Sequence, residues 1–286
     1  MDSRTYASIL ETICYADLFD YPLKEEEVRR WIKGRKGVGY TDIRKANGVI
    51  IHKDSFVFMK GREKILQQRI KREKITKNKL TIAQRIVSVL KFIPTVKLIG
   101  VSGSVAMDNA KEEDDIDLFI ITSAKTIWFT RLLTTVAVEL FSERRRPGDK
   151  NVKNKICLNM FVDEQFLSMP KKNLYTAHEV CQLRVLFDRD NTYQEFLVAN
   201  SWVKKYLPNA VYSMKYRYSK NKNPYILNTI YYILNFLSKK VQLWYMRDRL
   251  TTETISEGHL AFHPRDYTDD VMAAFEKRVS TYAAKI

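Results

Sequence analysis

Apolar residues in the first sixty positions follow a helical spacing and then a strand-like one. Ile9 and Ile13 lie on one face of a predicted first helix. A second helix is predicted over Glu25–Ile32, because three glutamates at its start favour the positive end of the helix dipole. Thr41 is expected to cap a short third helix, and the apolar runs around a polar turn in 49–58 predict a β-hairpin.

The rest of the chain predicts a small mixed sheet followed by helices. Three β-rich runs and one helical run are expected, at 95–101, 116–122, 155–162 and 125–141. Beyond residue 165 helices are expected at 175–189, 192–206, 224–249 and 267–284. The predicted class is therefore α+β, with parts at 1–60, 61–79 (a basic helical connector), 80–165 (the mixed-sheet core) and 166–286 (a helical C-terminal domain).

Residues 1–60 resemble a winged helix, a shape that binds nucleic acids in some proteins and other proteins elsewhere. Charge favours a polyanionic partner, since 49 Lys and Arg against 33 Asp and Glu give a formal net charge of +16, and cations that neutralise phosphates release counterions. Nine of these cations fall in residues 60–79, which is either a track for a phosphate backbone or a solvated helix face. RNA is therefore the favoured macromolecular partner.

Cysteine usage and the N-terminus indicate a cytoplasmic protein. Cys14, Cys157 and Cys181 are far apart and have apolar neighbours, which fits reduced, buried thiols rather than disulfides or a zinc site. The N-terminal residues lack the basic start and apolar core of a secretory signal. The apolar run 225–237 is too short to cross a bilayer, so a buried helix and no membrane partner are expected. The oligomeric state stays open.

The residues that carry chemistry gather between two predicted strands. The first strand ends in Ser102-Gly103-Ser104 and opens into a helix, where backbone N–H groups and a close approach at glycine suit phosphate oxygens. The next strand opens on Asp115-Ile116-Asp117, and alternate residues of a strand share a face, so the two carboxylates project together. Such a pair favours a cation, and oxygen ligands suit Mg²⁺. An acidic strand edge that resists aggregation has the same pattern.

Together these motifs resemble the DNA polymerase beta-like nucleotidyltransferase superfamily, over about residues 80–165. The resemblance implies that Ser102, Gly103 and Ser104 hold a nucleoside triphosphate. It also implies that Asp115 and Asp117 bind two Mg²⁺ ions, which stabilise the attacking and leaving oxygens at the α-phosphorus. The implied reaction transfers a nucleotide to an acceptor hydroxyl and releases pyrophosphate. RNA is the favoured acceptor, and a small molecule or a partner protein is left open.

One position departs from that family. A third carboxylate normally lies on the next strand, here Lys155–Val162, and alternation places Asn159 at that position, where it is a poor base. Asp163 could replace it only from the strand end. An inactive, nucleic-acid-binding regulator is therefore the alternative to an enzyme. Lys155 shares the face of Asn159 and is a candidate for contacting the triphosphate, and the arginines at 144–146 are candidates for a phosphate clamp or an exposed helix end.

Other motifs narrow the range of functions. Thr176 and Glu179 fit a capping box at a helix start, which we favour over an acid–base pair of His178 and Glu179. The sequence has no Walker-type loop, Gly-x-Gly-x-x-Gly, His-Glu-x-x-His or Gly-x-Ser-x-Gly motif. Kinase, dehydrogenase, zinc protease and esterase classes therefore lack support.

Overall fold

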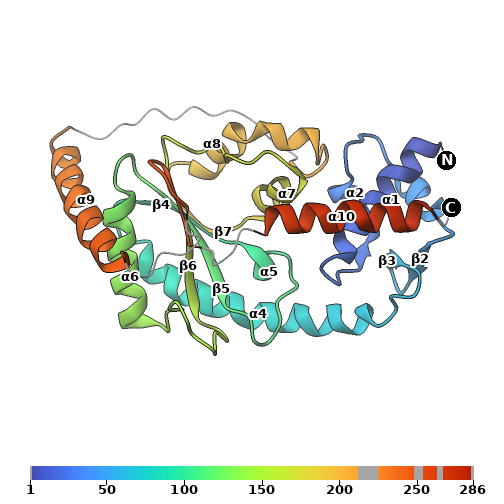
Figure 1. The fold of residues 1–286 in the computed structure, drawn as a ribbon, viewed down its shortest axis with the longest axis horizontal. Coiled ribbons are helices and arrows are strands. Elements are labelled where there is room, and N and C mark those ends of the chain that lie inside the picture. Colours follow the sequence, from blue (N-terminus) through green and yellow to red (C-terminus); the bar gives the residue numbers. More distant parts are fainter. Residues whose placement is uncertain (1, 212–224, 248–253, 263–266, 285–286) are drawn as a thin grey trace.

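The computed structural model describes residues 2–211, 225–247, 254–262 and 267–284. These residues form an α+β fold, in which a small N-terminal unit adjoins a larger unit built on a mixed sheet (Figure 1). One long helix, α4 (Ile65–Leu90), runs from the first unit along the second. The predicted class is thus confirmed, and the arrangement within each unit determines where the candidate site lies.

The N-terminal unit contains three helices and a three-stranded antiparallel sheet of order β1-β3-β2. Its elements are α1 (Ser3–Asp17), β1 (Leu23–Lys24), α2 (Glu25–Trp31), α3 (Tyr40–Lys45), β2 (Ile50–Lys53) and β3 (Phe56–Met59). Ile9, Ile13 and Ile43 are buried in its core. Thr41 is not the cap that we predicted, because α3 starts one residue earlier and the Gly39 N–H donates to Asp42 Oδ2 at 3.0 Å.

The larger unit has a six-stranded mixed sheet of order β7-β4-β5-β6-β9-β8 within the described residues. Its strands are β4 (Val96–Val101), β5 (Ile116–Thr122), β6 (Ile156–Asp163), β7 (Arg184–Asp188), β8 (Thr254–Ile255) and β9 (His259–Ala261). Strands β5 and β6 are parallel, and the other neighbours are antiparallel. The helix predicted over 175–189 is therefore wrong in its second half: α7 (Leu174–Gln182) ends and β7 pairs with β4, whose backbone groups need partners.

Helices cover both faces of this sheet. On one face, α4 and α6 (Ile127–Phe141) pack against Ile116, Leu118 and Ile120 of β5. On the other face, α7 and α8 (Thr192–Ala199) with the short helix η1 (Ser201–Lys205) pack against Phe119 and Ile121. The alternation predicted for β5 is confirmed, and it directs Asp117 to the face that α7 covers.

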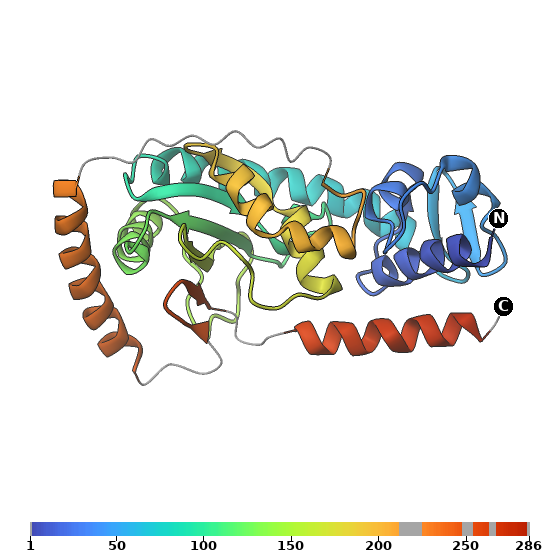
Figure 2. The same cartoon turned by 90° about the horizontal axis from the view of Figure 1, so that it is seen from above.

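Two further helices lie at opposite ends of the molecule. Helix α10 (Thr268–Ala283) returns along α1 of the N-terminal unit (Figure 2). Helix α9 (Tyr225–Met246) packs on α6, yet it exposes Ile233, Leu237 and Trp244, the last by 71%, so the predicted buried helix is wrong. Among the described residues, every helix is too short or too polar to traverse a bilayer.

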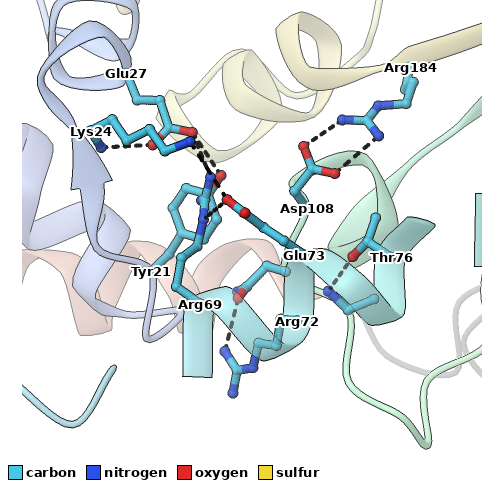
Figure 3. Close-up of polar contacts among 11 residues, drawn as sticks. Tyr21, Lys24, Glu27, Arg69, Arg72, Glu73, Thr76, Asp108 and Arg184 are labelled. Carbon is cyan, nitrogen blue, oxygen red and sulfur yellow. Dashed lines mark hydrogen bonds and ion pairs between the residues drawn. The ribbon is translucent and has the colours of Figure 1, made fainter. Parts of the chain in front are cut away.

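Basic residues of α4 are partly internal rather than solvent-facing. Arg69 is buried and donates to Glu27 of α2 at 2.9 Å and to Glu73 at 2.8 Å, as Figure 3 shows. Arg72 is also buried and donates to a carbonyl oxygen of the N-terminal unit. Lys79, only 1% exposed, bonds to the loop before β5. Both predictions for residues 60–79, a continuous basic track for a phosphate backbone and a solvated helix face, are therefore wrong for Arg69, Arg72 and Lys79.

Candidate active site

Two aspartates and a cysteine converge at one end of the parallel strand pair. Asp115 and Asp117 lie at the start of β5, and Cys157 of β6 stands opposite Asp117 in the strand register. One ligand atom from each of the three lies within 4.8 Å of the others. The two carboxylates therefore project together, as alternation along the strand predicts.

In the strand register, Cys157 rather than Asn159 stands opposite Asp117. Between Asp117 and Phe119 the pairing advances two residues on β5 but three on β6, from Cys157 to Met160, which is a β-bulge. Asn159 lies at this bulge, 4% exposed, and its carbonyl oxygen accepts the Phe262 N–H. Alternation along one strand does not predict the register against the neighbouring strand, so the sequence did not indicate that Cys157 stands opposite Asp117.

Asp163, the other candidate for the third carboxylate, serves the backbone. Its oxygens accept the N–H groups of Lys125 at 2.5 Å and Gln165 at 2.9 Å. Burial raises its pKa to about 6, even though these hydrogen bonds favour the charged form. The Asp163 carboxylate therefore links the backbone at Lys125 to the backbone at Gln165, and none of these hydrogen bonds involves Asp115 or Asp117.

The electrostatics of the site favour a bound cation. Burial, followed by the neighbouring charge of Asp115, raises the pKa of Asp117 to about 7. Burial and then the two carboxylates hold the pKa of the Cys157 thiol well above its usual range, so that the sulfur stays protonated. A cation between the carboxylates would relieve their repulsion.

Only one arginine of the 144–146 run reaches the site. Arg145 Nη1 lies 2.6 Å from Asp115 Oδ2, because the segment before it pairs with β6 and the Arg145 N–H donates to the Ile156 carbonyl. Arg144 and Arg146 both bind Glu139, at 2.7 Å. Of the three arginines, which we considered either as a phosphate clamp or as an exposed helix end, Arg145 alone pairs with an aspartate of the site.

The Gly-Ser turn brings the backbone against the aspartates. Gly103 has a φ of +63°, and a Cβ at this position would lie 3.1 Å from Asp117 Oδ2. The Ser102 N–H donates to the Asp117 carbonyl at 3.0 Å. The following helix, α5 (Gly103–Ala106), is a single turn, and the first strand opens into a helix at Gly103 as expected.

Two predicted phosphate ligands contact other carboxylates. Ser104 Oγ donates to Asp114 Oδ2 at 2.8 Å, and Lys155 Nζ lies 2.8 Å from Asp149 Oδ2. Of the predicted nucleotide-binding residues, Ser102 and Gly103 therefore adjoin the aspartate pair in this structure. Lys155 and Ser104 are held nearby by their own carboxylate partners.

The donor set fits one Mg²⁺ ion. Magnesium binds through one or two carboxylates and completes its shell with water and substrate phosphates. Asp115 and Asp117 meet that requirement, and the glycine at position 103 leaves Asp117 Oδ2 uncrowded. For a second ion, the group of three adds only the protonated thiol of Cys157.

A cavity that the sequence did not indicate adjoins this site. It has a volume of about 290 Å³, and its lining includes Ser102, Asn159, Glu179 and His259. The predicted capping box at Thr176 and Glu179 is wrong, because Asn173 caps α7 by accepting the Thr176 N–H at 2.9 Å. Glu179 is therefore not used in capping and faces the cavity.

His178 is not an acid–base partner of Glu179. Its ring is buried and stacked on Tyr15 at a centroid separation of 4.1 Å, and burial lowers its pKa to about 3. The preference against an acid–base pair of His178 and Glu179 thus agrees with the structure, for a different reason than helix capping.

Comparison with protein families, curated proteins and solved structures gave no match for this chain. A functional proposal therefore depends on the chemistry and geometry of the residues themselves.

Proposed function

We propose that this protein is a Mg²⁺-dependent nucleotidyltransferase of the DNA polymerase beta-like type. It would move a nucleoside monophosphate from a nucleoside triphosphate to an acceptor hydroxyl. The observation that carries the proposal is the pair Asp115 and Asp117, which project together beside the close backbone approach at Gly103. A half-buried pair of carboxylates, in which the pKa of Asp117 is raised to about 7, is more typical of a functional site than of a solvated strand edge.

Each neighbouring residue has a role in this proposal. Asp115 and Asp117 would hold Mg²⁺, which supplies charge neutralisation at the phosphate oxygens. Gly103 leaves space for the triphosphate at the turn, and the Ser102 N–H fixes the turn against Asp117. The Arg145 guanidinium, 2.6 Å from Asp115, is within reach of a phosphate bound beside that carboxylate.

The N-terminal unit supports RNA as a partner. Three helices with an antiparallel sheet of order β1-β3-β2 fit the winged helix that the sequence resembles. The net charge of +16 remains large even though Arg69, Arg72 and Lys79 are internal. RNA as acceptor stays a prediction that the experiment below addresses.

One observation favours a second candidate function. The residue opposite Asp117 on β6 is Cys157, the position expected to hold a third carboxylate is Asn159, and Arg145 already pairs with Asp115. These features fit a protein that binds nucleic acid without turnover. The two candidates differ in whether pyrophosphate is released.

The deciding experiment incubates the protein with Mg²⁺ and each α-labelled nucleoside triphosphate in turn, with total RNA or with a small-molecule extract. An enzyme releases pyrophosphate and labels an acceptor, and Asp115→Asn/Asp117→Asn abolishes both. Glu113→Gln, which changes an exposed acid in the same loop, is the matched control and should retain activity. Unchanged RNA binding by the double variant, with no pyrophosphate from any form, would establish the regulator.

A further inference from the structure

The cavity beside the aspartate pair has mostly apolar walls. Phe119, Met160, Val180 and Phe196 are among its lining residues, which come from β5, β6, α7 and α8. It reaches the candidate active site at Ser102, whose N–H is bound to the Asp117 carbonyl. A ligand in this cavity therefore lies next to the position proposed for the triphosphate.

Two polar groups in the cavity have no partner in the described part of the chain. No hydrogen bond among the described residues uses the Glu179 carboxylate, and His259 Nε2 is buried without a donor or acceptor. A buried nitrogen without a partner, such as His259 Nε2, destabilises a native protein and calls for an explanation, whereas the Glu179 side chain is half-buried. A bound molecule that offers a hydroxyl group could bond to both side chains.

Glu179 also lies close to the candidate active site. Glu179 and Ser102 line the same cavity, and the Ser102 N–H donates to the Asp117 carbonyl at 3.0 Å. Among the residues that line the cavity, Asn159 carries an amide, which is a very poor base, whereas Glu179 carries a carboxylate. Asp115 and Asp117 are assigned to the cation.

We propose that this cavity is the acceptor site of the proposed transfer, that it takes a small, mainly apolar alcohol or phenol, and that Glu179 is the base that accepts the hydroxyl proton. This inference rests on the proposed nucleotidyltransferase function. It deepens that function by naming the class of acceptor.

The size and polarity of the cavity favour such an acceptor over an RNA end or a sugar. A volume of about 290 Å³ is at the lower end of small-molecule sites. Placing a ribose phosphate or a polyhydroxylated sugar against carbon-rich walls would leave many polar groups without water or partners. An aromatic or alicyclic ring with one hydroxyl matches the walls and leaves a donor for Glu179.

The chemical step balances within the proposed reaction. The acceptor O–H bond breaks and its proton moves to the Glu179 carboxylate, while the oxygen forms a bond to the α-phosphorus. The bond from that phosphorus to the bridging oxygen breaks, and pyrophosphate leaves with the electron pair. Glu179 then returns the proton to solvent, and the nucleoside triphosphate is the only co-reactant.

The test uses 2-naphthol as probe, because its fluorescence reports binding without any nucleotide. We expect saturable binding to the full-length protein, and at least a tenfold weaker dissociation constant for Ala261→Leu and Met169→Trp, which fill the cavity from different sides. Asp115→Asn/Asp117→Asn should bind the probe normally.

With Mg²⁺ and nucleoside triphosphate, Glu179→Gln should bind 2-naphthol but transfer label to it at least 100-fold more slowly. Glu195→Gln, an exposed site on α8, is the control for an isosteric change.

The outcomes separate this inference from the function on which it rests. Label transfer to RNA by a protein that does not bind 2-naphthol overturns the acceptor site and leaves the nucleotidyltransferase intact. Saturable 2-naphthol binding without pyrophosphate release from any nucleotide overturns the proposed function, and the acceptor role with it. Transfer by Glu179→Gln at the wild-type rate overturns the base.

Discussion

At the scale of single residues, Gly103 sets how closely the backbone passes the aspartate pair. Gly103 and Gly148 both have positive φ, but a Cβ would approach Asp117 Oδ2 at 3.1 Å from the first and meet nothing within 4 Å from the second. Alanine at either position costs about 1–2 kcal/mol of backbone strain. We expect only Gly103→Ala to reduce the rise in Tm that Mg²⁺ produces, as measured by thermal unfolding with and without the ion. Equal Mg²⁺ responses of the two alanine variants would contradict a role for the close approach.

His178 makes stability depend on pH. Burial lowers its pKa to about 3, so the unfolded chain, with a pKa near 6.5, takes up the proton first as the pH falls. The contribution of neutral His178 to the free energy of unfolding is therefore fully present above pH 6.5. It decreases as the pH falls, by about 3 kcal/mol at pH 4. His178→Phe keeps the stack on Tyr15 and removes the titration, so urea unfolding should show a smaller loss between pH 7 and 4. His52→Asn changes an exposed histidine and should behave as wild type; the same slope in all three proteins would refute the assignment to His178.

At the scale of elements, Lys79 links α4 to the loop that carries the aspartates. Its Nζ donates to the carbonyl oxygens of Glu112 and Asp114 and to Asn154 Oδ1. Lys79→Met leaves these acceptors unsatisfied in a buried position, which costs about 2–4 kcal/mol. We expect a lower Tm and weaker Mg²⁺ binding, both measurable by calorimetry. Lys77→Met removes an exposed cation of the same helix and should change neither.

Elements whose own residues carry a complete pattern were predictable from sequence. Strand β5 was expected at 116–122 and has those bounds. Its own residues alternate between the two faces of the sheet, so no distant segment is needed to recognise it. Strand β7 was not expected, because Arg184–Asp188 is ordered by pairing with β4, more than eighty residues earlier in the chain. Within the site, alternation predicted the aspartate pair. The place of Cys157 opposite Asp117 depends on the register between β5 and β6, and the place of Glu179 depends on how α7 packs on the sheet. Both involve segments that are far apart in the chain.

At the scale of the whole molecule, the two ends of the described chain stabilise each other. Helix α10 lies along α1, and buried Asp17 at the end of α1 accepts hydrogen bonds from Arg62 and from Arg278 of α10. The start of α10 contributes Thr268 to the cavity lining. The N-terminal unit thereby fixes an element that shapes the proposed acceptor site, although the two are separated along the chain.

Removing the Asp17 carboxylate tests this coupling. Asp17→Ala leaves two half-buried guanidinium groups without their shared partner, and after allowance for solvent screening we expect the free energy of unfolding to fall by about 2 kcal/mol. Because α10 loses its attachment to α1, its backbone amides should exchange with deuterium faster, and the dissociation constant for 2-naphthol should rise several-fold through Thr268. Glu63→Ala removes an exposed acid beside Arg62 and should leave both quantities unchanged. Unaltered amide protection along α10 in Asp17→Ala would mean that the helix is held by its apolar contacts alone. Phe275 against Tyr15 would then be the position to change, because it is buried on the same interface and carries no charge.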